Sequence, residues 1–303
     1  MNILKKLQRS ITYRTSKNEW HKLAVHHEFS GYKKHSVYLE SIGIHLDENK
    51  HISLLRGYSS AKKLVANGGR LFLENGVLLL AHSGLRVEIQ TAEELFIACE
   101  ILVDKCYEFH IAEPCLILDI GMNVGIASLY FASQKNVVAV YGFEPFEPTF
   151  KQAQENFRRN PSVSQKIKSN NIGLGDCNKE MMVDYSPSNR GRVGLFGTNL
   201  VKNEFVDLGQ ELIKIKSASE VLKEIITSRP SIKKVVKMDV EGAEFEIIEN
   251  LYNNGILSSF DAIMMEWHKT EPTEIIHSLS KNGFTAFKQN YNSHVGMIYA
   301  SKQ

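Results

Sequence analysis

The chain has 303 residues, enough for about two average domains, and its 43% hydrophobic and 23% charged residues are those of a globular protein. These proportions exclude a collagen, a coiled coil and an intrinsically disordered chain, and the net charge of +2 gives no general attraction to nucleic acid. The four cysteines lack zinc-site spacing, and no apolar run approaches the roughly 18 residues that span a bilayer. We therefore expect a cytoplasmic protein with reduced thiols, no transmembrane segment and no secretory signal.

The N-terminal 36 residues are strongly basic, because Lys and Arg outnumber Glu by eight to two. Ile3, Leu4, Leu7 and Ile11 have the spacing of a helix face. We interpret this segment as a solvated helix that packs on the main domain, with contact to a membrane surface as the alternative.

The next segment, 37–69, is predicted to be helical. It is followed by apolar runs that Asn75-Gly76 and Ser83-Gly84 separate. Two-residue turns of this type join antiparallel strands, so residues 70–90 are predicted to form a β-meander.

A main domain is predicted from residue 91 onward. Thr91 begins a capping-box sequence, which predicts a helix through about Cys106. We assign residues 1–90 to an accessory helical and β-meander region, and residues 91–303 to the main domain.

Beyond Pro114, apolar runs typical of strands alternate with helical patterns, which predicts βαβ units and a parallel sheet with right-handed crossovers. The last two strands have too little sequence between them for a crossover helix and are expected to pair antiparallel. The predicted strands are 115–120, 137–143, 166–172, 234–239, 261–267, 285–289 and 295–301, and the helices are 124–133, 147–160, 217–228, 243–253 and 271–282. The fold class is therefore α/β, with a mostly parallel seven-stranded sheet whose last strand is antiparallel.

The most informative motif is LDIGMNVG at residues 118–125, which follows a buried strand and opens a helix. Open α/β sheets bind ligands at this position, and Gly121 and Gly125 let the backbone approach a ligand closely. The loop lacks the third glycine of the dinucleotide fingerprint, so a nicotinamide-dependent oxidoreductase is the weaker interpretation. A ligand with an amino-acid moiety and a ribose, such as S-adenosylmethionine (SAM), suits the loop better.

The ends of the next two predicted strands carry further candidate ligand contacts. Glu144 follows the second strand, where a carboxylate can accept hydrogen bonds from both ribose hydroxyls. Ile172, at the end of the third strand, could cover an adenine ring.

These motifs occur together with KMDVEGAE at 237–244 and MEWH at 265–268. In order and spacing, over about residues 90–300, the chain resembles the FkbM-type methyltransferase family. The resemblance implies a Rossmann-like class I methyltransferase fold and a SAM-dependent O-methyltransferase, with sugars, polyketides or other secondary metabolites as acceptors. The cofactor-binding residues that we infer are Asp119, Gly121, Met122, Asn123, Gly125, Glu144, Pro145, Ile172 and Asp239. Met122 stands where the family usually has Ala.

Methyl transfer to an alcohol requires alignment of the acceptor oxygen and loss of its proton, so a base or a metal ion is expected beside it. The catalytic candidates are Asp239, at the end of the fourth predicted strand, and Glu266 and His268, at the end of the fifth. His268 is the preferred base because imidazole titrates near neutral pH, while the two acids could orient it or share a divalent ion.

A metal ion is not expected, because no third or fourth ligand is evident in the sequence. We assign Glu244 to stabilisation of a helix N-terminus, and Glu241 stays undecided.

The Gly-rich segment 186–203 is predicted to be either a mobile lid or a flexible surface loop. Its Arg190 and Arg192 could bind an acidic or phosphorylated acceptor. The absence of an Asn/Asp-Pro-Pro-aromatic motif argues against nucleic-acid methylation. We expect a small-molecule or glycan acceptor, with a non-catalytic scaffold that keeps the SAM fold as the alternative.

Overall fold

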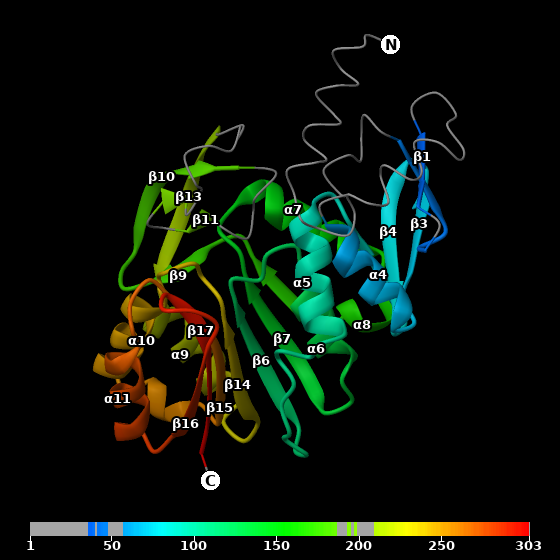
Figure 1. Ribbon diagram of the computed structural model, residues 1–303. Helices are drawn as coiled ribbons and strands as arrows, with labels where there is room; N and C mark the ends of the chain where they lie inside the picture. The colour runs from blue at the N-terminus through cyan, green and yellow to red at the C-terminus, as the bar shows by residue number, and fades with distance from the viewer. Residues whose placement is uncertain are drawn as a thin grey trace. The chain divides into compact units, whose positions relative to one another are not determined.

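The computed structural model describes residues 36–39, 41–47, 57–186, 193–194, 197–198 and 209–302 (Figure 1). The chain divides into two compact units, Met1–Cys106 and Tyr107–Gln303. The predicted basic helix within residues 1–36 lies outside the described part of the chain. No helix among the described residues is long and apolar enough to cross a membrane.

The described part of the first unit starts with a hairpin where a helix was predicted. Strands β1 (Ser36–Leu39) and β2 (Ile44–Asp47) pair antiparallel, and among the described residues of the predicted span 37–69 the α-helix is α4 (Tyr58–Ala66). Exposed and buried side chains alternate through residues 41–46, which is the period of a strand, and Gly43 adopts φ +66° in the turn. The helical prediction is therefore wrong for the strands at 36–39 and 44–47 and confirmed for Tyr58–Ala66.

The predicted β-meander is confirmed, with β3 (Arg70–Glu74), β4 (Val77–His82) and β5 (Leu85–Glu88) in antiparallel order. Both residues of each connecting turn have positive φ, as hairpin turns that match the strand twist require. Helix α5 (Ala92–Leu102) follows and packs against α4. The capping box at Thr91 is formed, and α5 belongs to the first compact unit.

The second unit is built on a seven-stranded sheet in the order β16-β17-β15-β14-β6-β7-β8. All neighbours pair parallel except β17, which runs antiparallel to both β15 and β16. The predicted fold class is confirmed. The strands are β6 (Cys115–Ile120), β7 (Val137–Phe143), β8 (Ile167–Asn170), β14 (Lys233–Met238), β15 (Ala262–His268), β16 (Thr285–Asn290) and β17 (Val295–Ser301).

Helices cover both faces of this sheet, with α6 and α7 on one face and α9, α10 and α11 on the other (Figure 1). A hydrophobic core lies under the second group, where Leu118, Val236 and Trp267 of the sheet pack with Leu222 and Ile248 of the helices. The helices are α6 (Ile126–Ser133), α7 (Glu147–Arg158), α8 (Pro161–Ser164), α9 (Ala218–Ser228), α10 (Glu244–Asn253), the 3-10 turn η3 (Leu257–Ser259) and α11 (Thr273–Lys281).

A second sheet in this unit has the order β10-β13-β9, with β9 (Gly173–Gly175), β10 (Lys179–Tyr185) and β13 (Gly209–Ser217). The chain leaves the main sheet after Asn170, earlier than predicted, and β9 pairs parallel with β13. Of the segment 186–203, the two-residue strands β11 (Val193–Gly194) and β12 (Gly197–Thr198) are described and pair antiparallel. Arg190 and Arg192 lie outside the described residues.

The loop after β6 crosses very close to the end of β14. Gly121 adopts φ +79°, and a Cβ atom there would lie 1.8 Å from the carbonyl oxygen of Asp239. No side chain fits at that distance, so glycine is required both for the backbone angle and for the close approach.

We predict that Gly121→Ala destabilises the protein by several kcal/mol, as measured by denaturant unfolding. A left-handed angle costs a residue with a Cβ about 1–2 kcal/mol, and the clash with Asp239 adds about 1–3 kcal/mol. Gly255→Ala is the matched control, because Gly255 has φ +70° and open space around its Cβ position. Equal losses for the two variants would contradict the close approach.

Candidate functional site

The loop between β6 and α6 is held by backbone hydrogen bonds at the carboxyl end of the sheet. The N–H groups of Gly121 and Met122 donate to the carbonyl of Phe143 at 3.1 and 2.9 Å, and the N–H of Val124 donates to Asn123 Oδ1 at 2.7 Å. Gly125, with φ +82°, precedes α6, and a Cβ atom on it would lie 2.6 Å from the ring of Phe157. The loop thus has a fixed path between β7 and α7.

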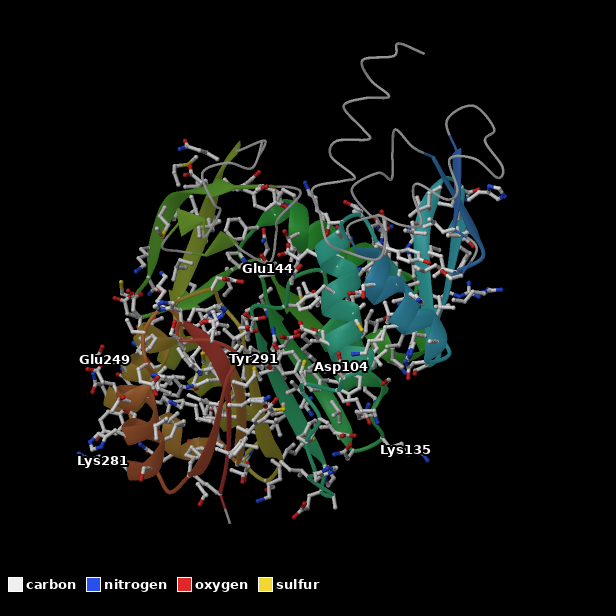
Figure 2. The ribbon with its side chains drawn as sticks, in the orientation of Figure 1. Asp104, Lys135, Glu144, Glu249, Lys281 and Tyr291 are labelled. Carbon is white, nitrogen blue, oxygen red and sulfur yellow. The ribbon has the colours of Figure 1, made fainter. Side chains whose placement is uncertain are left out.

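Glu144 lies just past the carboxyl end of β7, while Lys135 precedes the start of that strand (Figure 2). Its carboxylate is buried and accepts the N–H of Asn123 on Oε2 at 2.9 Å and the N–H of Phe146 on Oε1 at 3.1 Å. Burial raises the pKa of Glu144 to about 7, against the opposing effect of these two hydrogen bonds and of Lys237. Each oxygen keeps a further lone pair for a ligand hydroxyl.

The turn after Glu144 is fixed from the neighbouring strand. Asn171 donates through Nδ2 to the carbonyls of Glu144 and Pro145, at 2.9 and 3.1 Å. Pro145 and Ile172 are both half-buried, and Ile172 packs against the core under α9, α10 and α11. Pro145 directly follows Glu144, and Ile172 directly follows Asn171, which holds the turn after Glu144 in place.

Met122 lies differently from the other residues of the loop. Its side chain is 1% exposed, and a Cβ atom on Gly142 would lie 2.3 Å from its sulfur. The thioether fills the space that Gly142 leaves on β7, so only the backbone of Met122 remains to contact a ligand.

A buried ion pair lies beneath the loop. Asp119 is fully buried, accepts the hydroxyl of Ser128 on Oδ2 at 2.6 Å, and has Lys237 Nζ 3.2 Å from Oδ1. Lys237 also donates to the carbonyl of Gly121 at 2.5 Å, and its ammonium lies 5.6 Å from the centre of the Tyr107 ring. Lys237 thus joins β14 to the loop after β6, a role that the sequence motif did not reveal.

The pKa of Lys237 reflects two opposing effects. Burial lowers it, but the charges of Asp119, Asp239 and Glu144 outweigh burial and raise the pKa above the usual value of lysine. The ammonium is therefore a permanent positive charge at the centre of the site.

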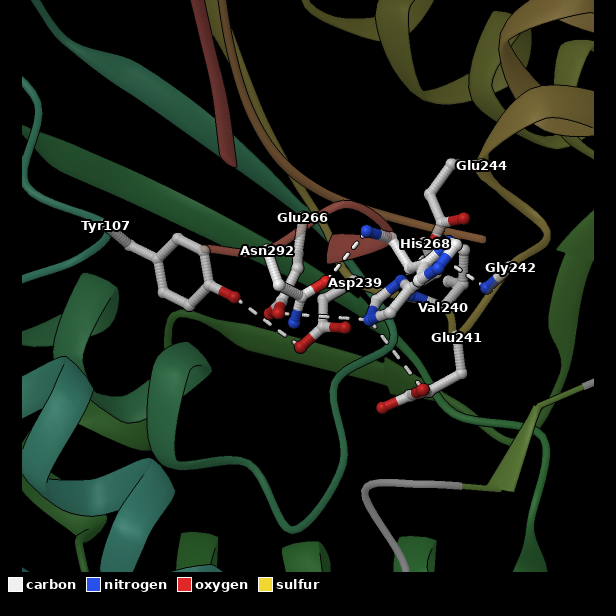
Figure 3. Close-up of polar contacts among 10 residues, drawn as sticks. Tyr107, Asp239, Val240, Glu241, Gly242, Glu244, Glu266, His268 and Asn292 are labelled. Carbon is white, nitrogen blue, oxygen red and sulfur yellow. Dashed lines mark hydrogen bonds and ion pairs between the residues drawn. The ribbon is translucent and has the colours of Figure 1, made fainter. Parts of the chain in front are cut away.

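Two carboxylates and one imidazole lie close together where β14 and β15 end (Figure 3). The ligand atoms of Asp239, Glu266 and His268 all lie within 4.8 Å of one another. The hydroxyl of Tyr107 donates to Asp239 Oδ2 in a long hydrogen bond of 3.5 Å. The structure thus brings together the three residues that the sequence selected as catalytic candidates.

His268 is oriented by Glu244, the first residue of α10. Nδ1 of His268 donates to Glu244 Oε1 at 2.8 Å, and the same fully buried carboxylate accepts the N–H of Gly242 at 3.1 Å. Nε2 faces carboxylate oxygens of Glu241 and Glu266 at 3.7 and 3.8 Å. Burial alone lowers the pKa of His268, but Glu244, together with Glu241 and Asp239, raises it to about 9.

The sequence carried a signal for this role of Glu244. The helical period that buries Ile247, Ile248 and Leu251 places Glu244 on the same buried face. A carboxylate on the buried face of a helix needs a polar partner, and helix-terminus stabilisation alone does not supply one.

We predict that Lys237→Met lowers the free energy of unfolding by about 3–5 kcal/mol, because it leaves Asp119 as an uncompensated buried charge. The double variant with Asp119→Asn should recover part of that loss, as a denaturant-based double-mutant cycle will show. Lys234→Met is the control, because the buried Lys234 ammonium donates to the carbonyl of Pro230 at 2.7 Å. If Asp119→Asn fails to rescue Lys237→Met specifically, the two charges are not coupled.

Comparison with known proteins identifies the family of the chain. The chain is 26% identical over 193 residues to Methyltransferase 1 of Beauveria bassiana, covering 60% of this chain and 75% of that protein. It is 28% identical over 170 residues to the hexuronic acid methyltransferase AglP of Haloferax volcanii, covering 56% of this chain and 63% of that protein, which is less than two thirds of its length.

Among solved structures, the methyltransferase FkbM of Methylobacillus flagellatus matches with a TM-score of 0.44 and 13% identity, over 82% of this chain and 60% of that one. At that similarity the fold assignment rests on the strand order described above. The methyltransferase FkbM domain profile matches residues 119–286, more than half of the chain and all of the motifs from Asp119 to His268. The chain therefore belongs to the FkbM family of methyltransferases.

Proposed function

We propose that this protein transfers a methyl group from SAM to a hydroxyl of a small molecule or a glycan. The observation that carries the proposal is the buried carboxylate of Glu144, fixed by two backbone N–H groups beside the loop at 121–125. A preorganised carboxylate at the end of the second strand of an open α/β sheet suits a ribose, whose two hydroxyls donate hydrogen bonds.

The remaining residues of the edge fit the other parts of SAM. The Gly121 loop offers backbone at close range, Ile172 offers an apolar surface for the adenine, and Asp239 offers a carboxylate for the amino group. SAM supplies the activated methyl group when it is bound. The protein's own contribution is then to align the acceptor oxygen with that group and to exclude competing geometries.

The acceptor end of the site is the group formed by Asp239, Glu266 and His268. An alcohol that accepts a methyl group loses its proton, and Asp239 or Glu266 would receive it. The pKa of His268, raised to about 9, keeps the imidazole protonated near neutral pH, so His268 would hold the oxygen as a hydrogen-bond donor. Asp239 and Glu266 are half-buried, so an acceptor can reach them from solvent.

The acceptor class follows from the family and from charge. One relative is named a hexuronic acid methyltransferase, which supports a sugar hydroxyl or a related small molecule as the acceptor. The net charge of +2 gives no general attraction to nucleic acid, so we propose no nucleic-acid acceptor. We also propose a cytoplasmic location. Membership of a methyltransferase family disfavours the oxidoreductase alternative, while a scaffold would bind the cofactor without turnover.

We predict that the protein binds S-adenosylhomocysteine (SAH) and that Glu144→Gln weakens this binding by about tenfold or more, because one charge-assisted acceptor is lost. Calorimetry measures the affinity. Glu147→Gln is the control, because Glu147 is an exposed residue of α7 paired with Lys151. Labelled methyl transfer from SAM to a panel of sugars and other alcohols tests turnover, and SAH binding without transfer to any acceptor would favour the scaffold.

We also predict that SAH affinity rises with pH from about 6 to about 8 and then levels off. The pKa of Glu144 is raised to about 7, so the carboxylate that accepts ribose hydroxyls forms over this range. Binding favours the ionised form and therefore releases a proton, which calorimetry in buffers of different ionisation enthalpy detects. A slope that persists unchanged in Glu144→Gln would assign the titration to another group.

A further inference from the structure

Three potential ligand atoms converge at the carboxyl ends of β14 and β15. Glu266 and His268 are two residues apart on β15 and project to the same side of the sheet, and Asp239 follows the neighbouring strand. Their ligand atoms lie within 4.8 Å of one another, and Figure 3 shows the side chains gathered around one point. A divalent ion held at about 2.0–2.4 Å from each ligand requires ligand atoms no more than about 4–5 Å apart. The cluster therefore has the dimensions of a cation site.

His268 is oriented as a metal ligand would be. Its Nδ1–H donates at 2.8 Å to Glu244, a fully buried carboxylate that the N–H of Gly242 also fixes. Histidines that bind metal ions almost always donate their other ring N–H to a carboxylate or a carbonyl in this way, which sets the tautomer. A cation at this point would replace the Nε2 proton, which the raised pKa of about 9 otherwise keeps in place near neutral pH, and would bind the lone pair that faces Glu266.

Nε2 itself is an independent indication of a ligand. The His268 side chain is 95% buried, yet no hydrogen bond from any described residue reaches Nε2. Its polar neighbours are the carboxylates of Glu241 and Glu266 at 3.7 and 3.8 Å, beyond hydrogen-bond length. A ring nitrogen that faces carboxylate oxygens without a hydrogen bond to them is a coordination position that a cation would satisfy.

The charges around His268 also favour a bound cation. The carboxylates of Asp239, Glu241, Glu244 and Glu266 lie around the imidazole of His268. Two ammonium groups lie nearby: Lys237 is bound to Asp119 and to the carbonyl of Gly121, and Lys269 lies beside Gly242. A divalent cation among the four carboxylates would offset the repulsion that remains between them.

We propose that Asp239, Glu266 and His268 bind one divalent cation of the Mg²⁺ or Mn²⁺ class. Carboxylates select these ions, and the imidazole ligand favours Mn²⁺ over Ca²⁺. The sequence analysis expected no metal because it found no third or fourth ligand beside Asp239 and Glu266, and the structure brings His268 next to them as a third. The consequence for catalysis rests on the proposed function: an open coordination position would bind the acceptor oxygen and favour loss of its proton.

The test is Mn²⁺ binding to the full chain after removal of metal ions by a chelator, followed by electron paramagnetic resonance. We expect one Mn²⁺ per chain, about tenfold or more weaker in Glu266→Gln, and spin-echo modulation from an imidazole nitrogen that His268→Gln abolishes. Glu271→Gln is the matched control, because Glu271 is an exposed carboxylate just beyond β15, paired with Lys288. Thermal unfolding checks that each variant is folded, and Glu266→Gln keeps the test valid if His268→Gln does not fold.

Two outcomes overturn the cation site: no stoichiometric Mn²⁺ in the wild type, or binding that Glu266→Gln leaves unchanged. SAH binding, measured on the same samples without metal, separates this proposal from the proposed function. SAH binding without Mn²⁺ overturns the cation site alone, whereas Mn²⁺ binding without SAH overturns SAM dependence and leaves the cation site standing.

Discussion

The buried ammonium of Lys237 is the positive charge around which the carboxyl edge of the main sheet is organised. Asp119, Glu144 and Asp239 each follow or end a different strand, and their charges all act on this lysine. Without it, three carboxylates would face one another across a region of low dielectric, at a cost of several kcal/mol. Because Lys237 also donates to the carbonyl of Gly121, the same ammonium that balances the charges also fixes the position of the loop after β6. A change that removes this ammonium therefore disturbs both the charge balance and the loop.

From this centre the site extends in two directions with different character. Toward β7 it is rigid, because Glu144 is bound by backbone N–H groups on both oxygens and Asn171 holds the following turn. Toward β15 it is acidic and partly open to solvent, with Tyr107 and Glu244 orienting the side chains from two sides. A rigid half suits a ligand that every family member shares, and an open half suits a partner that differs between members.

The sequence predicted the sheet well and its surroundings less well. Runs such as 115–120 and 137–143 are buried on both faces, so their apolar character alone locates them. The hairpin at 36–47 was missed because a short amphipathic strand and a short helix have similar composition, and only the alternating burial of residues 41–46 separates them. Glycines that a close backbone approach requires, such as Gly121, were recognised because they form a sequence motif. The burial of the Met122 side chain was not predicted, because its partner, Gly142, is distant in sequence and contributes only the space that a missing side chain leaves. The helical period places Glu244 on a buried face, but it does not identify His268, 24 residues away, as the partner.

The reversed strand β17 lies between β15 and the edge strand β16. Its pairing places Gly296 opposite Trp267, where any Cβ would lie 2.9 Å from the indole nitrogen. A one-residue slip of β15 would exchange the buried indole with the faces that carry Glu266 and His268, and this tight fit prohibits it. Strand β17, whose register against β15 is fixed, thus separates the outer strand β16 from the residues Glu266 and His268. Mutations can accumulate along that edge, or a new surface can evolve there, while the alignment of the acidic group stays the same.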